Sequence, residues 1–459
     1  MPDHPTVPRS SKREPVGLAS VTTQPFGHRL DLGIGSIALG TLYAGADNCE
    51  AVQPAEGATM TGAAEGLRDE AAVLLDDTIT LRRELHRHPE LGLDLPRTQQ
   101  VILGALVGLP LSVSTGTSTT SVIATLEGGK PGPTTLLRAD MDALPMTEDT
   151  GLPFASEVPG AMHACGHDAH VAMLVGAARL LSRRQSALPG RVVLMFQPGE
   201  EGYAGASAML DDGLLDEVGP VERAFAIHVT PLAPSGWVAS KPGAFMASAD
   251  AFRLVVTGQG GHASMPHDAV DPVPVACEIV TALQAMVTRR IAVSDPAVLT
   301  VASIHAGTTD NVIPESAELL GTVRALSEGS RAATLEGLER VAGHVAAAHL
   351  CEATITAIPP GYPVTVNDAV ALEEVLGIAE DLLGADHVVR MPTAVMGAED
   401  WSFVLQRVPG SMVLLGMAPP GVAHPAPNHS NRMVLDEAAL ATGVALHAAV
   451  ALRTADALA

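Results

Sequence analysis

Cysteine is scarce in this chain of 459 residues. Four cysteines are present, they are widely spaced, and no two of them form a short motif. They are Cys49, Cys165, Cys277 and Cys351. This spacing argues against a disulfide framework and favours a reducing compartment. We therefore expect the protein in the cytoplasm.

Basic side chains are also few. The chain carries 27 lysines and arginines against 51 aspartates and glutamates, which gives a formal net charge of −24 at pH 7. A net charge of this sign repels the phosphates of nucleic acids and the headgroups of anionic lipids. We expect neither a nucleic acid nor a membrane surface as a partner.

The sequence has no apolar run long enough to span a membrane. Residues 32–46 are largely apolar, but Gly33 and Gly35 interrupt them and the stretch is shorter than the ~20 residues that span a bilayer. Residues 1–65 are rich in proline, glycine, serine and threonine, which predicts a disordered extension. The alternative is an atypical export leader within residues 1–46.

The remaining chain is long and apolar enough for a sizeable core. Hydrophobic residues make up 47% of the sequence and aromatic residues 3%, and 459 residues allow one large core or two medium ones. Apolar spacing predicts a first helix from Leu67 to Arg87. Short apolar strands, such as 134–139 and 191–197, then alternate with helices such as 171–181. This alternation predicts a mostly parallel α/β sheet with helices on both faces.

A different order of elements begins near residue 247. Predicted strands and helices follow one another there in the order βαββαβ, which is the split-βαβ arrangement, and the first pattern returns afterwards. We therefore predict an α/β catalytic domain formed by residues 66–246 and 359–459. An α+β domain, residues 247–358, is inserted into it.

Side chains typical of metal ligands gather in the octapeptide HACGHDAH, residues 163–170. In an extended loop, Cys165 and His167 lie two positions apart and would point the same way, toward one metal ion or two adjacent ions. We expect Asp168 to cap the following helix. Thiolate and imidazole suit zinc, and imidazole also accepts manganese, nickel or cobalt.

Further candidate ligands follow segments that we predict as buried strands. An open α/β sheet places its active site at the carboxyl ends of its strands. Glu200 and Glu201 end one such segment. The side chains of adjacent residues point in different directions there, so one carboxylate could bind a metal while the other acts as a base. His228 ends another segment. Asp140 and Asp142 follow a third, and we leave open whether they bind a metal or orient a histidine.

The inserted domain adds three polar candidates. The glycines of GQGGHAS allow a close backbone approach and present His262, whose imidazole could donate to an oxyanion. Asn311 and Arg324 could bind an amide or a carboxylate of a substrate, the arginine through two parallel hydrogen bonds.

Eight motifs, in order and spread from about residue 70 to 450, resemble one known family. This is the aminoacylase, hippurate hydrolase and indole-acetyl-amino-acid hydrolase family of two-metal amidohydrolases, which are related to carboxypeptidase-type metallopeptidases. The motifs are HRHPELG (86–92), RADMDALP (138–145), HACGHDAH (163–170), QPGEEG (197–202), GHASMPH (261–267), NVIPESAELLGTVR (311–324), MGAEDWSF (396–403) and HSNRMVLDE (429–437).

The resemblance implies cleavage of an N-acyl amino acid, such as a hippurate-like or N-acetyl conjugate or a small peptide, into a carboxylate and an amino acid. It implies a metal-activated water, with Glu200 as the general base, and a lid domain that dimerises in many members. We expect a homodimer or a higher oligomer through that domain. The implied ligands of two divalent ions, zinc, manganese, nickel or cobalt, are Cys165 in the bridging place, His167, Glu201, His228 and His429.

The resemblance also implies that the three polar candidates of the inserted domain hold the oxyanion and the substrate carboxylate. These are His262, within the subunit or across a dimer, Asn311 and Arg324. The chain departs from the family at Met433, where relatives usually carry an aromatic residue, and His424 competes with His429 for the ligand role. The role of Glu399 stays open.

Two other functions are compatible with the same residues. Cys165 could be the nucleophile of a cysteine amidase, with His167 or His228 as its base. Alternatively, the pocket could bind an acyl amino acid without cleaving it, since a fold does not guarantee an activity. Sensitivity to a chelator, compared with sensitivity to a thiol alkylator, distinguishes these alternatives.

Overall fold

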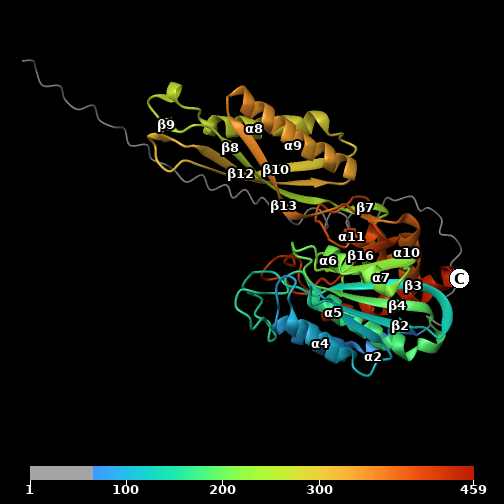
Figure 1. Ribbon diagram of the computed structural model, residues 1–459. Coiled ribbons are helices and arrows are strands. Elements are labelled where there is room, and N and C mark those ends of the chain that lie inside the picture. The colour runs from blue at the N-terminus through green and yellow to red at the C-terminus, as the bar shows by residue number, and fades with distance from the viewer. Residues whose placement is uncertain (1–65, 459) are drawn as a thin grey trace, which may run out of the picture.

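The structure is a computed structural model that describes residues 66–458 (Figure 1). The predicted extension at residues 1–65 lies outside the described residues. Within the described range, no helix combines the length and the apolarity that are needed to cross a membrane.

A central sheet of eight strands forms the catalytic domain. Across the sheet the order is β1 (Ser112–Thr115), β2 (Val122–Glu127), β4 (Pro189–Gln197), β3 (Lys130–Asp140), β5 (Arg223–Thr230), β16 (Gly410–Gly416), β6 (Val238–Ser240) and β15 (Val388–Arg390). The strands run parallel from β4 through β3 and β5 to β16, and again from β6 to β15. The pairs β1–β2, β2–β4 and β16–β6 are antiparallel.

Helices cover both faces of this sheet, because its central strands are apolar on both sides. In β4, Val192 and Leu194 belong to one buried cluster, whereas Val193 and Met195 belong to another on the opposite face. The first cluster lies under α2 (Leu67–Val73), α3 (Leu75–Arg87), α4 (Pro96–Leu106), α5 (His167–Arg183), α10 (Ala369–Leu383) and α12 (Leu440–Leu458). The second lies under α6 (Gly205–Asp211), α7 (Leu214–Val218) and α11 (Ser402–Leu405).

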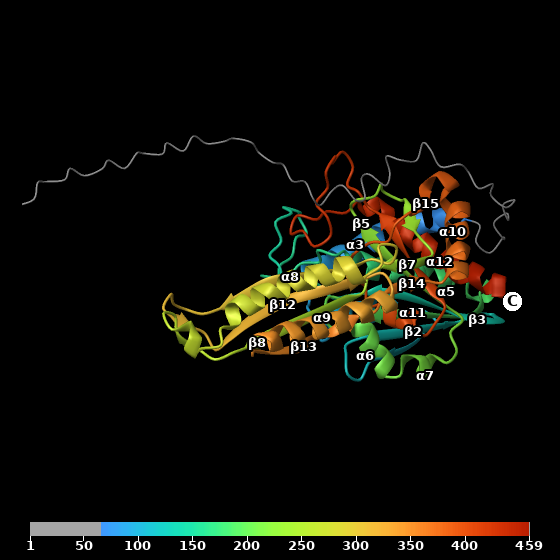
Figure 2. The same cartoon turned by 90° about the horizontal axis from the view of Figure 1, so that it is seen from above.

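Along the chain, the elements of the inserted domain are β8 (Ala249–Thr257), α8 (Pro272–Arg290), β10 (Ala297–Ala306), β12 (Ser316–Ala325), α9 (Glu328–Ala348) and β13 (Glu352–Tyr362). The four strands form an antiparallel sheet in the order β10-β12-β8-β13. The two helices lie side by side on one face of this sheet (Figure 2). The predicted βαββαβ order and the predicted fold class are confirmed.

Short ribbons mark the two ends of the inserted domain. At the end nearer the central sheet, β7 (Gly243–Met246) pairs with β14 (Thr365–Asn367). The two segments that connect the inserted domain to the catalytic domain therefore lie next to each other. At the opposite end, β9 (Gly261–His262) pairs with β11 (Val312–Ile313). Figure 1 shows β9 at the end of the inserted domain that points away from the central sheet.

Two local predictions were wrong. The first helix is broken at Leu74 into α2 and α3. The segment around Cys165 is not an extended loop, because Gly166 adopts a left-handed conformation (φ 87°). The residue that caps α5 is Gly166 and not Asp168, since the helix begins at His167. A side chain at Gly166 would approach Val229 of β5 to 2.4 Å, so a glycine is needed for this close approach.

Candidate active site and metal centre

The five predicted metal ligands converge at the carboxyl edge of the central sheet. Cys165 and His167 lie at the start of α5, Glu201 follows β4, and His228 lies near the end of β5. His429 lies in the loop that follows β16. Since β4, β3, β5 and β16 are neighbours in the sheet, their carboxyl ends bring these side chains together, as expected for an open α/β sheet.

The ligands form two triplets that share one residue. The potential ligand atoms of Cys165, His167 and His228 all lie within 4.8 Å of one another, and the same holds for Cys165, Glu201 and His429. The Cys165 sulfur lies 3.3 Å from Nε2 of His228. A carboxylate oxygen of Glu201 lies 3.2 Å from Nε2 of His429. A sulfur that belongs to both triplets is the arrangement expected for a thiolate that bridges two ions.

The donor atoms fit two divalent cations. Nδ1 of His167 donates to the carbonyl oxygen of Asp142 at 2.9 Å, and Nδ1 of His228 donates to the carbonyl oxygen of Val229 at 2.8 Å. In both rings Nε2 is therefore the nitrogen that could bind a cation. Nε2 of His167 is buried and makes no hydrogen bond. Imidazole, thiolate and carboxylate together suit borderline divalent metals.

The pKa of Cys165 argues against a nucleophilic role for this residue. Burial, followed by the carboxylate of Glu201, raises the pKa of the Cys165 thiol above its usual value. A nucleophilic cysteine needs the opposite shift. Hydrogen bonds with Cys165 and Glu201 raise the pKa of His429 to about 10. The protons held here would be displaced by cations, which stabilise the thiolate directly.

Asp140 and Asp142, whose roles the sequence left open, hold the segments that carry the ligands. The carboxylate of Asp142 accepts the backbone N–H groups of Glu200 and Glu201, both at 3.0 Å. Asp140 is paired with Nδ1 of His170. Nε2 of that imidazole accepts the N–H of Val229 at 2.9 Å, next to His228. Both aspartates therefore support the ends of β4 and β5.

A buried arginine that sequence reasoning missed lies beneath the site. Arg138 of β3 is fully buried and donates to Asp140 at 2.7 Å, to Glu399 at 2.8 Å and to Asp400 at 3.1 Å. Its motif, RADMDALP, was visible in the sequence. The partners are not predictable from local spacing, because Glu399 follows Arg138 by 261 positions.

Asn428 is a second residue whose role sequence reasoning missed. Its amide donates to the carbonyl oxygens of Cys165 at 3.1 Å and of Val229 at 3.2 Å. The backbone N–H of His429 donates to the carbonyl of Ala164 at 2.8 Å. These contacts hold the loop after β16 against the loop before α5. His424 belongs to neither ligand triplet.

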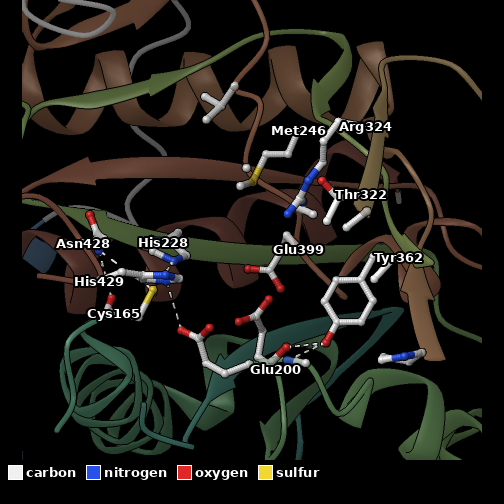
Figure 3. Close-up of a pocket in the computed structure, with 18 of the residues that line it drawn as sticks. Cys165, Glu200, His228, Met246, Thr322, Arg324, Tyr362, Glu399, Asn428 and His429 are labelled. Atoms are coloured by element: carbon white, nitrogen blue, oxygen red, sulfur yellow. Dashed lines mark hydrogen bonds and ion pairs between the residues drawn. The ribbon is translucent and has the colours of Figure 1, made fainter. Parts of the chain in front are cut away.

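Four of the candidate metal ligands, Cys165, Glu201, His228 and His429, line a cavity of about 680 Å³ between the two domains. Glu200 lines this cavity and is 6% exposed. Burial, followed by the charges of Glu399 and Glu201, raises the pKa of Glu200 well above its usual value. Figure 3 shows the Glu200 and Glu399 carboxylates facing the guanidinium of Arg324, which reaches the cavity from β12.

The other two candidates of the inserted domain lie elsewhere. His262 and Asn311 are both exposed and line a separate hollow beside β9 and β11. This hollow is at the end of the inserted domain that points away from the central sheet (Figure 1). Within the described chain, the structure therefore brings Arg324 to the cavity and leaves His262 and Asn311 at a distance from it.

A buried ion-pair network attaches α5, and therefore His167, to α3. The carboxylate of Asp168 accepts from Nε of Arg82 at 3.0 Å and pairs with Nδ1 of His86 at 2.7 Å. Glu148 pairs with the other nitrogen of His86 at 3.3 Å. Burial alone would lower the pKa of His86, but the charge and hydrogen bond of Asp168 outweigh it, so that the pKa rises to about 9.

This network predicts a loss of stability at alkaline pH. The pKa of His86 is higher in the folded state than its usual value of 6.5. Protonated His86 therefore contributes fully to the stability of the fold below about pH 6.5, and this contribution is lost as the pH rises through about 9. We expect the free energy of unfolding to fall by on the order of 1–3 kcal/mol across this window. Urea denaturation of the metal-loaded protein from pH 6 to pH 9.5 measures it. A His86→Gln variant should lose this part of the pH dependence, and an equal slope in both proteins would contradict the assignment.

Comparison with known proteins agrees with this geometry. Residues 136–453 match the family described as peptidase family M20/M25/M40. The chain is 37% identical over 392 residues to thermostable carboxypeptidase 1 of Saccharolobus solfataricus, covering 85% of this chain and 98% of that protein. It is 38% identical to the IAA-amino acid hydrolase ILR1-like 2 of Arabidopsis thaliana, with 83% of this chain and 85% of that protein covered.

Two Bacillus subtilis proteins are also similar. N-acetylcysteine deacetylase is 39% identical, and the match covers 74% of this chain and 87% of the deacetylase. The crystal structure of the YXEP protein, described as a dinuclear metal-binding peptidase of the M20 family, has a TM-score of 0.72 and 34% identity, with 84% of this chain and 99% of that chain covered. These matches confirm the predicted family resemblance, the use of two divalent metal ions and the action on amide bonds. The chain belongs to peptidase family M20/M25/M40.

Proposed function

We propose that this protein hydrolyses the amide bond of N-acyl amino acids and releases a carboxylate and an amino acid. One observation carries the proposal: candidate metal ligands, Glu200 and the cationic Arg324 line the same cavity. The Arabidopsis and Bacillus relatives named above are described by substrates of this kind, an amino-acid conjugate and an N-acetylated amino acid.

The proposed ligands divide between two ions. His167 and His228 would hold one ion and Glu201 and His429 the other, with Cys165 available to both; the two triplets that share Cys165 support this division. When bound, the cations supply Lewis acidity, which lowers the pKa of a water molecule and polarises the amide carbonyl. Zinc, manganese, nickel and cobalt are the candidates.

Glu200 is proposed as the general base. Its carboxylate takes a proton from the attacking water and returns it to the nitrogen of the leaving amino acid. Burial and the neighbouring Glu399 carboxylate raise its pKa, which suits a group that must first accept a proton and then give it back. The cavity wall also shields this transfer from bulk water.

Arg324 is proposed to hold the substrate carboxylate. Burial lowers its pKa somewhat and the charge of Asp250 raises it, so the guanidinium stays cationic at neutral pH. Asp250 is itself paired with Arg331 at 2.7 Å, so Arg324 can pair with a substrate carboxylate. The apolar part of a substrate would contact the cavity wall formed by Leu232, Met246, Ile358, Val395 and Leu414.

A second subunit is proposed to complete the site. His262 and Asn311 lie at the end of the inserted domain and line their own hollow. We propose a homodimer or higher oligomer through the inserted domain, in which these residues stabilise the oxyanion and bind the substrate in the cavity of another subunit. The bounds 247 and 358 of this domain are part of the proposal, and the regular pairing of β13 with β8 up to Ile358 supports them.

Metal removal tests the function. Protein loaded with zinc, manganese, nickel or cobalt is expected to release free amino acid from hippurate or N-acetylmethionine. Excess EDTA should lower the rate by at least roughly 100-fold, because the cations supply several kcal/mol of transition-state stabilisation, and adding the metal back should restore it.

Two other results would contradict this prediction. Activity that survives EDTA and is blocked by iodoacetamide would support a cysteine amidase that uses Cys165. Binding of these substrates by the metal-loaded wild type without release of an amino acid would support a non-catalytic binding protein.

A further inference from the structure

Tyr362 stands where the chain leaves the inserted domain and re-enters the catalytic domain. It is the last residue of β13, and a register shift separates its pairing with Ala249 from the regular pairing that ends at Ile358. Its ring is 7% exposed. The ring packs edge to face against Phe403 of α11, with 6.1 Å between the ring centroids.

The phenol oxygen of Tyr362 contacts three backbone groups of one turn. Its O–H donates to the carbonyl oxygen of Glu200 at 2.5 Å, and the oxygen accepts the N–H groups of Gly202 at 2.9 Å and Ala204 at 3.2 Å. Figure 3 shows the phenol of Tyr362 beside the Glu200 backbone, with the contact between the two residues dashed. Burial and the charge of Asp400 raise the pKa of Tyr362, so the phenol remains a hydrogen-bond donor at neutral pH.

This turn depends on side chains for its conformation. Gly202 has a φ of 85° and Ala204 a φ of 52°, and a positive φ is uncommon for a residue that carries a side chain. Asp142 accepts the N–H groups of Glu200 and Glu201 from one side. The phenol of Tyr362 holds the turn from the other side. The orientation of the Glu200 side chain therefore depends on both contacts.

We propose that Tyr362 is a positioning residue for the reaction, which holds the 200–204 turn so that the Glu200 carboxylate has the orientation required for proton transfer. The inference rests on the proposed function, in which Glu200 is the general base. Because Tyr362 pairs with Ala249 of β8 in the inserted domain, the phenol also couples the placement of that domain to the placement of Glu200. A displacement of about 1 Å at a catalytic group can lower a rate by roughly 100-fold.

The variant Tyr362→Phe tests this role, because it removes the three hydrogen bonds and keeps the ring that packs on Phe403. We expect kcat for hippurate to fall roughly 10- to 100-fold. KM should change by less than about twofold, because substrate contacts are kept, and the metal content should not change. Tyr203→Phe is the matched control, since Tyr203 lies in the same segment but is 54% exposed; it should leave kcat and KM as in the wild type.

Hydrogen exchange supplies a readout that does not depend on activity. Amide exchange of a peptide covering residues 199–206 should be faster in Tyr362→Phe and unchanged in Tyr203→Phe. In Tyr362→Phe, Ala204 loses the phenol as its acceptor, and Gly202 loses one of its two acceptors, keeping the Glu200 carbonyl oxygen at 2.7 Å. Unchanged exchange together with a wild-type kcat would overturn the proposal. A lower melting temperature with unchanged kcat and KM would also overturn it, because the role would then be structural only. A failure of the proposed function can be told apart from a failure of the Tyr362 proposal, since the wild type itself would then not hydrolyse hippurate.

Discussion

Replacing Glu200 by glutamine is expected to lower kcat by roughly 10²–10⁴-fold while the protein keeps both metal ions. Glutamine has the same shape as glutamate but cannot accept a proton at neutral pH. The side chain lines the cavity and is almost buried, so no solvent group can readily replace it. Steady-state kinetics with hippurate or N-acetylmethionine, together with metal analysis of the same sample, measures the effect.

The neighbouring carboxylate provides the control. Glu201→Gln should lose metal as well as activity, because Glu201 belongs to the triplet with Cys165 and His429.

Glu200→Gln should not lower the melting temperature. The glutamate is buried beside the Glu399 and Glu201 carboxylates, which raise its pKa, and a neutral side chain removes this repulsion. A Glu200→Gln enzyme that retains activity within a factor of about ten would refute the base assignment.

Replacing Arg138 by methionine is expected to lower the free energy of unfolding by about 3–5 kcal/mol. The guanidinium is the buried partner of Asp140, Glu399 and Asp400. Methionine fills a similar volume but leaves these carboxylates without a cation in a site that water does not reach, which is costly. Urea denaturation of the metal-loaded protein at pH 7 measures the loss.

An exposed arginine is the matched control for this prediction. Arg390 pairs with Glu373 at 2.8 Å and with Glu380 at 2.5 Å, and its side chain is 46% exposed. Arg390→Met should cost less than about 1 kcal/mol, because solvent screens exposed pairs. If Arg138→Met costs no more than Arg390→Met, the buried network does not contribute to stability in the way that its geometry indicates.

Much of the fold could be predicted because its signals are local. The apolar strands at 134–139 and 191–197 correspond to β3 and β4, and the inserted βαββαβ unit has the predicted order. Errors arose where a local pattern allowed two outcomes. The apolar spacing continues through Leu74, so the break between α2 and α3 is not visible, and Gly166 reveals its left-handed conformation only when β5 lies against it.

The candidate site was predictable in its residue types and less so in its arrangement. Cys165, His167, Glu201, His228 and His429 were recognisable as candidates from their chemistry, and the motif resemblance favoured His429 over His424 as the last ligand. The supporting contacts of Asn428 and Tyr362 were not recognisable, because these residues bind backbone groups of distant segments. Such contacts leave no periodic pattern in the sequence.

The amino-acid sequence by itself determined the strands and helices, the family and the candidate side chains, because hydrophobic periodicity and short motifs are properties of neighbouring residues. Only the tertiary structure decided that Cys165 belongs to two ligand triplets, that Arg138 lies beneath them, and that Arg324 reaches the cavity while His262 and Asn311 do not. These facts follow from the order of the strands in the sheet and from the placement of the inserted domain. Both depend on packing between segments that are far apart along the chain.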